Sequence, residues 1–399
     1  MKILMVGWYS ELGRDLMEDP EVSVTVLEEP SLLSDIPSTV SRVEARYQQD
    51  SDYQEVVSRL WETTPFDLVI AGREYGASPA QWLCDKYALP SAGNLATQAS
   101  TDKSILRRVL EEGGLPTVRS ELVHTSADVK RFWNGNPVVL KPANRHASIG
   151  VVQISHQEEI DHAWHAATSA GEGSGSIDRN LDWTYIIEDW VPGKEYSVES
   201  VFSDGETFHN ITEKTVVGGG RFTPVRHVVP APLSTTESQE LIEAQVLLAE
   251  VVGIKRGLMH AEWKKDSSQC WPIEFAVRYP GDSISLLIRK ATGINLARAW
   301  VDGLQGKLHL PAKRSTRSAG IAFIQHPTGR YVKIDGMPSL DSPGVIEVAW
   351  TANPGELLLP LDDSKARVGS ITVQANDYAR VAALLDEYEA GVTISVEHP

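Results

Sequence analysis

Three features that would each mark a particular class of protein are scarce in this sequence. Cysteine occurs only at Cys84 and Cys270, so neither a disulfide framework nor a thiolate metal site is indicated, and a reduced, cytoplasmic setting is expected. No apolar run approaches the roughly 20 residues that a membrane-spanning helix needs. Positive charge is also scarce, with 37 lysines and arginines against 54 acidic residues, which argues against nucleic acid or an anionic membrane as a partner.

The formal net charge of −17 has a second consequence, since any site for a polyphosphate must gather its basic residues locally. At 399 residues the chain is long enough for two or three domains. Its first residues, MKILMVGWYS, contain a short apolar run that ends in glycine, which is typical of a first strand and not of a signal peptide.

Residues 1 to 100 alternate short β-branched apolar runs with helical or polar stretches, the pattern of a parallel sheet. The first run ends in GWYSELG, which lacks the glycine spacing of a dinucleotide-binding fingerprint. The third run, FDLVIAG, delivers Arg73 and Glu74 at its carboxyl end. Open α/β sheets present ligand-binding groups there, so Glu74 is a candidate substrate contact, with a solvated loop as the alternative.

Two lysines are candidates for contact with an anion. Lys103 lies in the first turn of a predicted helix, where the helix dipole does not favour a cation, so it either points to solvent or is recruited by an anion. Lys141 is the only charge in the apolar strand PVVLKP, and a buried lysine needs an anionic partner. The next loop contains Ser148 and Gly150, which would let the backbone approach a ligand. It is not a Walker loop, so it is a weak phosphate signal by itself.

The stretch from His260 to Gly281 is predicted to form two strands joined by the polar turn KKDSSQ. Residues two apart share one face of a strand, so antiparallel pairing would bring Glu262 and Glu274 to one cleft, with Arg278 just beyond. Neighbouring carboxylates repel unless a cation lies between them. Mg²⁺ suits them because it is a hard ion that takes oxygen ligands and bridges to nucleotide phosphates. An ordinary surface hairpin is the alternative.

The remaining elements follow from periodicity. EYSVESVF starts a second hairpin, QELIEAQVLLAEVVG is an amphipathic helix, and the chain after residue 317 alternates short strands with a closing helix around 378–389. Two glycine-rich stretches interrupt the pattern: 171–180 is expected to be a flexible surface loop, and 218–220 either a lid or a disordered tip.

Taken in order, these pieces resemble the ATP-grasp superfamily, and within it the carboxylate–amine ligases such as bacterial L-amino acid ligases. The motifs that carry the resemblance are TDK, VVLKPA, SIGV, IIEDWVPGKEYSVE, EKT, HVVPA, HAEW, IEFAVRYPGD and ATGINLARAWVDGLQGK. The resemblance implies an ATP-grasp fold of the α/β and α+β classes. It would have a Rossmann-like N-terminal parallel-sheet domain (1–100), a small lobe (101–185), a large lobe (186–310) and a small C-terminal α+β domain (311–399).

The same resemblance implies a site for ATP and Mg²⁺, with Mn²⁺ as an alternative ion, between the two lobes. The implied nucleotide contacts are Lys103, Lys141, Ser148, Gly150, Glu188, Asp189, Trp190, Val191 and Glu195, and the implied metal ligands are Glu262 and Glu274. The implied catalytic residues are Arg278, Lys214 and His227, and those toward the substrate are Glu74, Arg278 and His260. His209, His227 and His260 are candidate bases, with a structural role as the alternative for each.

One departure from the family pattern stands at Ala276, where many ATP-grasp enzymes carry an asparagine ligand, so the number of metal ions is left open. The resemblance implies an ATP-dependent ligase that joins the carboxylate of an amino acid to an amine through an acyl phosphate and releases ADP and phosphate. The alternatives are a purine-pathway or carboxylase-type ATP-grasp enzyme and a non-catalytic ATP-binding regulatory protein. The expected partners are small molecules, and the resemblance makes a homodimer plausible.

Overall fold

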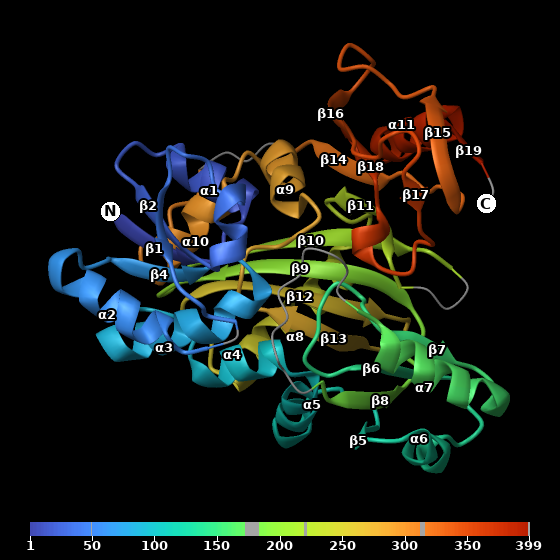
Figure 1. Ribbon diagram of the computed structural model, residues 1–399, viewed down its shortest axis with the longest axis horizontal. Helices are drawn as coiled ribbons and strands as arrows, with labels where there is room; N and C mark the ends of the chain where they lie inside the picture. The colour runs from blue at the N-terminus through green and yellow to red at the C-terminus, as the bar shows by residue number, and fades with distance from the viewer. Residues whose placement is uncertain (49, 172–182, 219–221, 312–315, 398–399) are drawn as a thin grey trace.

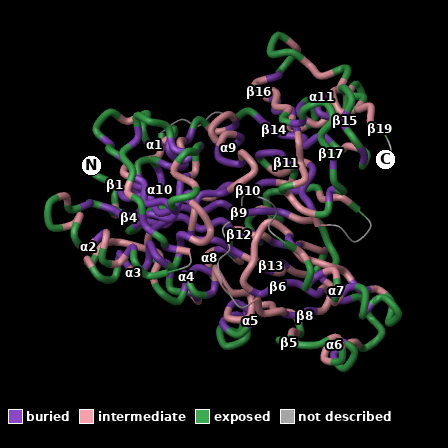
Figure 2. Tube along the Cα trace, in the orientation of Figure 1, coloured by how far each residue is buried: buried purple, intermediate pink, exposed green. Residues whose placement is uncertain are grey.

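The computed structural model describes residues 1–48, 50–171, 183–218, 222–311 and 316–397. Most of the glycine-rich stretches expected at 171–180 and 218–220 therefore lies outside the described residues. None of the helices within these ranges combines the length and apolar character that a membrane crossing requires. Figure 2 shows that the buried residues concentrate on the central strands, while exposed residues lie on the outer helices and loops.

The N-terminal sheet is parallel, which confirms the prediction from the alternating pattern. Its strands follow the order β3-β2-β1-β4 and are β1 (Lys2–Val6), β2 (Ser23–Glu28), β3 (Ser41–Glu44) and β4 (Leu68–Ala71). Alternate residues of β1 enter different cores: Ile3 packs with α1 (Ser10–Met17), and Leu4 packs with α2 (Tyr53–Thr63) and α3 (Ala77–Tyr87). Helices therefore cover both faces of this sheet (Figure 1).

The small lobe is a four-stranded antiparallel sheet with two helices on one face. Its order is β5-β8-β6-β7, with β5 (Ser120–Val123), β6 (Val138–Pro142), β7 (Val152–Ile154) and β8 (Tyr185–Asp189). Residues of α6 (Ser126–Phe132) and α7 (Ile160–Ser169) share a core with these strands. The helices α4 (Asn94–Thr101) and α5 (Lys103–Glu112) precede this sheet, and the Asp102 side chain caps α5 by accepting from Ser104 N.

An eight-stranded sheet forms the centre of the molecule (Figure 1). Its order is β13-β12-β9-β10-β11-β14-β18-β16, and its bounds are β9 (Lys194–Phe202), β10 (Thr207–Val216), β11 (Pro224–Val229), β12 (Gly257–Lys265), β13 (Cys270–Ala276), β14 (Ser318–Phe323), β16 (Val345–Trp350) and β18 (Gly369–Ala375). Both predicted hairpins are confirmed, as β12 with β13 and β9 with β10. The tail strands were expected, but sequence reasoning did not foresee that β14 would pair with β11 and continue this sheet.

The two faces of the large sheet differ in what they contact. On one face, Met259 and Ala261 pack with α8 (Thr235–Val252). On the other, Leu258 packs with α9 (Ile284–Thr292) and α10 (Leu296–Leu304), and the same face becomes polar farther along β12. A smaller sheet of order β17-β15-β19 and one helix complete the tail, with β15 (Gly329–Asp335), β17 (Leu357–Leu358), α11 (Tyr378–Gly391) and β19 (Thr393–Glu397).

Candidate active site

The polar face of the large sheet arranges its residues in rows across the strands. Residues opposite each other in an antiparallel pair face the same side, and so do residues two apart on one strand. The three rows, each two residues farther along the strands, are Lys264–Glu195–Lys214–His227, Glu274–Glu262–Ser197–Thr212 and Ala276–His260–Glu199–Asn210. The sheet thus places charged side chains of both signs from four strands on one surface.

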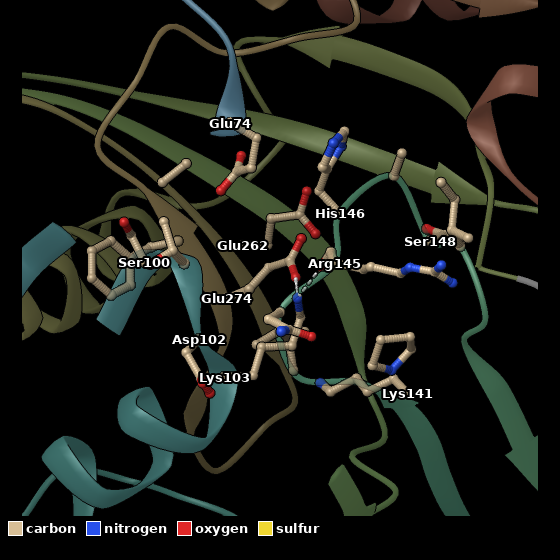
Figure 3. A pocket seen from close by; sticks show the side chains of 18 of the residues that line it. Glu74, Ser100, Asp102, Lys103, Lys141, Arg145, His146, Ser148, Glu262 and Glu274 are labelled. Carbon is tan, nitrogen blue, oxygen red and sulfur yellow. Dashed lines mark hydrogen bonds and ion pairs between the residues drawn. The ribbon is translucent and has the colours of Figure 1, made fainter. Parts of the chain in front are cut away.

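A cavity of about 1070 Å³ opens over this surface. It exceeds the range of about 300–1,000 Å³ that is usual for a site of one small ligand, so it has room for more than one. Of the residues expected at the site, those lining the cavity are Glu74, Lys103, Lys141, Ser148, Glu188, Asp189, Trp190, Val191, Glu195, Lys214, His260, Glu262, Glu274 and Arg278. Several of them point toward one another in Figure 3, where Lys103 meets Glu274. Gly150 and His227 do not line it.

Glu262 and Glu274 are direct partners in the register of β12 and β13, as the alternation predicts. Each has a lysine against it: Lys214 Nζ contacts Glu262, and Lys103 Nζ lies 3.0 Å from Glu274 Oε2. Their side chains keep 28% and 34% of their surface exposed to the cavity. Burial would raise the pKa of Glu262, but the Lys214 charge lowers it, so this carboxylate is ionised.

This arrangement fits a hard divalent cation such as Mg²⁺. Two carboxylates are held side by side and supply the oxygen ligands that such an ion takes. Each is now paired with a lysine ammonium group, Glu274 with Lys103 and Glu262 with Lys214. Within the described residues, no group of three or more His, Cys, Asp or Glu side chains is arranged to hold a metal. An ion at Glu262 and Glu274 would therefore complete its coordination with water or phosphate oxygens.

Glu188 is bound by two cations at the other end of the cavity. Lys141 Nζ lies 2.6 Å from its Oε2, and Arg107 donates to both oxygens at 2.8 and 3.1 Å. Arg107 also donates to the carbonyls of Pro272 and Ile273, so it joins the small lobe to β13. Burial would raise the pKa of Glu188, but the Arg107 and Lys141 charges lower it to about 2. The expected anionic partner of Lys141 is thus confirmed, whereas Arg107 was missed.

Lys264 lies beside the segment 188–191, which is expected to contact the nucleotide. Its Nζ is 3.5 Å from the Trp190 ring centroid, 3.4 Å from Glu195 Oε1, and it donates to Val191 O at 3.1 Å. Burial lowers the pKa of Lys264, partly opposed by the Glu195 carboxylate. The alternation along β12 places Lys264 on this face, but sequence reasoning gave it no role.

The loop after β6 adopts a conformation that costs energy. Ala147 and Ser148 have φ values of 62° and 60°, and left-handed backbone costs non-glycine residues about 1–2 kcal/mol each. Gly150 has φ 72°, and a Cβ there would lie 2.9 Å from Ala167 O. Gly150 is thus required by the backbone, while Lys103 holds the loop by donating to Arg145 O at 2.7 Å. Strain of this kind concentrates at ligand-binding loops.

Arg278 joins the large lobe to the N-terminal domain. Its Nε lies 2.5 Å from Oε2 of Glu74, the first residue of the short 3₁₀ helix η2 (Glu74–Gly76). Burial alone would raise the pKa of Glu74, but the Arg278 charge lowers it. Both side chains line the cavity.

The three candidate histidines have different surroundings. Of these three, only His260 is among the described residues that line the cavity, and its Nδ1 is 2.9 Å from Oε1 of Glu199. His227 is fully buried behind the cavity wall, with Nε2 3.1 Å from Asp282 Oδ2. His209 contacts Ser200 and Thr207 away from the cavity, and burial lowers its pKa to about 4. A direct contact of His227 or His209 with substrate has no support in this geometry.

Comparisons with known proteins agree with this fold. Residues 134–285 match the ATP-grasp domain. This central part of the chain is therefore similar to the ATP-grasp domain, and the chain has the ATP-grasp fold. Residues 322–397 match the L-amino acid ligase C-terminal domain 2, so the tail that continues the large sheet is similar to that domain.

Individual proteins and solved structures are also similar to this chain. Alanine–anticapsin ligase of Bacillus subtilis is 25% identical over 282 residues, which are 65% of this chain and 59% of that protein, so the chain spans less than two thirds of that relative. The L-amino acid ligase of Bacillus licheniformis has a similar structure, with a TM-score of 0.81, 21% identity, and coverage of 100% of this chain and 99% of that one. The biotin carboxylase domain of the Hydrogenobacter thermophilus 2-oxoglutarate carboxylase, solved with MgADP, ADP and bicarbonate, has a TM-score of 0.68 at 16% identity and covers 99% and 90% of the two chains.

Proposed function

We propose that this protein is an ATP-dependent carboxylate–amine ligase that forms an amide or peptide bond between amino acids. The observation that carries the proposal is the registered pair Glu262 and Glu274, which shares one cavity with basic groups from three parts of the fold. The matched tail domain favours an amino acid ligase over a carboxylase-type enzyme, which shares only the fold.

The proposed roles follow from where each side chain lies. The nucleotide is held by Lys103, Lys141, Ser148, the backbone of 188–191 and Glu195, and Mg²⁺ by Glu262 and Glu274. When bound, the ion neutralises phosphate charge and aligns the phosphates for transfer. Lys103 and Lys214 now neutralise those two carboxylates, and a divalent ion there would free both lysines to bind phosphate oxygens.

The reaction has two steps in which these side chains stabilise negative charge. The substrate carboxylate attacks the terminal phosphate, ADP leaves, and Arg278 would orient that carboxylate. An amine nitrogen then bonds to the acyl carbon, phosphate leaves with the C–O electron pair, and the nitrogen loses its proton to water. Basic groups at the cavity stabilise the oxyanion of this second step.

A test is to incubate the protein with ATP, Mg²⁺ and the proteinogenic amino acids, alone and in pairs, and to measure ADP, phosphate and new products by mass spectrometry. Condensation products matched one-to-one by ADP are expected. Glu274→Gln, prepared in the same way, controls for contaminating ATPases. Absence of ADP with every pair would overturn the proposal, and ADP formed only with bicarbonate would favour a carboxylase-type enzyme.

A further inference from the structure

Two arginine–carboxylate pairs line the cavity, and they come from opposite ends of the chain. Arg278 is paired with Glu74 of the N-terminal domain, at 2.5 Å. Arg367, from the segment of the tail just before β18, is paired with Asp282 of the large lobe, also at 2.5 Å. Neither Asp282 nor Arg367 was singled out from the sequence, because nothing local relates two residues so far apart.

Arg367 is held rigidly at the cavity wall. Its Nε donates to Ser364 O at 3.0 Å, its Nη1 to Pro224 O at 3.4 Å and its Nη2 to Asp282 Oδ1. The guanidinium carbon lies 3.9 Å from the Phe323 ring centroid. Within the described parts of the chain, these bonds use three of the five N–H donors of the Arg367 guanidinium, which leaves two for a ligand. The side chain keeps 13% of its surface exposed.

Asp282, the partner of Arg367, has a backbone conformation that costs energy. Asp282 and Ser283 both have left-handed backbone, with φ values of 58° and 56°, and each costs about 1–2 kcal/mol. Asp282 Oδ2 lies 3.1 Å from Nε2 of the buried His227, so both carboxylate oxygens have a donor. Strained residues persist where their surroundings hold them, and they concentrate at ligand-binding sites. His227 thus acts on the cavity through Asp282.

We propose that Arg367 binds the free α-carboxylate of the amino acid that supplies the amine. This inference rests on the proposed function, in which two amino acids enter one cavity and each carries a carboxylate. Arg278 lies four residues beyond Glu274, at the cation site where one carboxylate is phosphorylated. The second carboxylate takes no part in the chemistry, and a preorganised guanidinium is the group that recognises it best. The acceptors are therefore α-amino acids rather than simple amines, and the products keep a free C-terminal carboxylate.

In the experiment, the 399-residue protein is incubated with ATP, Mg²⁺ and an equimolar pool of amino acids and their C-terminal amides. Amides can act only as acceptors, and dipeptides are distinguished from dipeptide amides by mass. A charged hydrogen bond contributes about 1.5–3 kcal/mol, so the wild type should favour dipeptides by roughly tenfold or more. Arg367→Met should bring the ratio close to one by raising KM for amino acids and not for amides. Arg367→Lys should give an intermediate ratio.

The matched control is Arg226→Met. Arg226 joins β11 to α11 through Asp386 and Glu389 but does not line the cavity, so this variant should keep the wild-type ratio. A wild-type ratio near one, or an equal change in both arginine variants, would overturn the inference while leaving the ligase activity in place. Absence of any product would instead contradict the proposed function. If Arg367→Met fails to fold, Arg367→Lys, which keeps the charge, supplies the comparison, and an unchanged ratio in that variant would overturn the inference.

Discussion

Two sets of glutamates lie in the same cavity and are bound by cations in different ways. Glu188 is bound by both Arg107 and Lys141, and its side chain is only 6% exposed. Glu262 and Glu274 have one lysine each and keep about five times that exposure, at 28% and 34%. Two buried cations enclose Glu188, whereas Glu274 with its one lysine, and Glu262 with Lys214 and with His260 Nε2 at 3.8 Å, keep a side open to the cavity where a ligand can bind.

From this difference we predict that Glu188 is a structural acid and that Glu262 and Glu274 are ligand-binding acids. Arg107, which binds Glu188, also joins the small lobe to β13 through the Pro272 carbonyl, so this pair should matter to stability. The lysine pairs at Glu262 and Glu274 should matter to cation binding instead. The following predictions test that separation, beginning with the largest effect.

Glu274→Gln should lower turnover by roughly a thousandfold or more, because a cation that contributes several kcal/mol to the transition state loses a charged ligand. The change removes charge and not size, so the cooperative unfolding transition should be kept. ADP formation under saturating ATP and Mg²⁺ measures the effect. Turnover above a tenth of the wild-type value would show that Glu274 is not a metal ligand.

Arg107→Met should lower the free energy of unfolding by about 3–5 kcal/mol, because it breaks a buried ion pair and leaves Glu188 with one partner. Urea denaturation measures the loss. Lys130→Met removes an exposed partner of Asp161 and serves as the control, which should leave stability almost unchanged. Equal losses in the two variants would contradict the structural role assigned to Glu188.

Lys214→Met should tighten Mn²⁺ binding in the absence of nucleotide by roughly tenfold, because it removes a positive charge that repels the ion. Two unit charges about 4 Å apart interact by about 1 kcal/mol in bulk water and about 4 kcal/mol near a protein surface. Electron paramagnetic resonance of free Mn²⁺ measures this directly. Lys264→Met is the matched control, since Lys264 lies in the same row but pairs with Glu195. Unchanged or weaker Mn²⁺ binding in Lys214→Met would contradict the exchange of lysine for metal.

Acid should lower the free energy of unfolding partly through Glu188. Its pKa in the folded state is about 2, below its ordinary value of 4.5. A lowered pKa stabilises the fold above the unfolded value, and that contribution is lost as pH falls toward the folded value. Glu188→Gln should therefore lose less stability than the wild type between about pH 5 and pH 3. Parallel pH profiles for the two proteins would argue against this contribution.

The sequence predicts the site best where periodicity decides the geometry. Alternation along β12 and β13 places Glu262 opposite Glu274, and a lone lysine in an apolar strand requires the anion that Glu188 supplies. The Arg107–Glu188 pair could not be foreseen, because Arg107 stands in an amphipathic helix where arginine usually faces solvent. The Asp282–Arg367 pair depends on how the tail docks, and no local pattern encodes that docking.

The pairing of β14 with β11 makes the tail part of the same sheet as the proposed cation ligands. A chain that ended after α10 would leave the N–H and C=O groups of β11 along an open edge, where another chain could add as a strand. It would also lose the guanidinium beside Asp282. Shortening the protein in this way should therefore yield an aggregating fragment and not a smaller ligase.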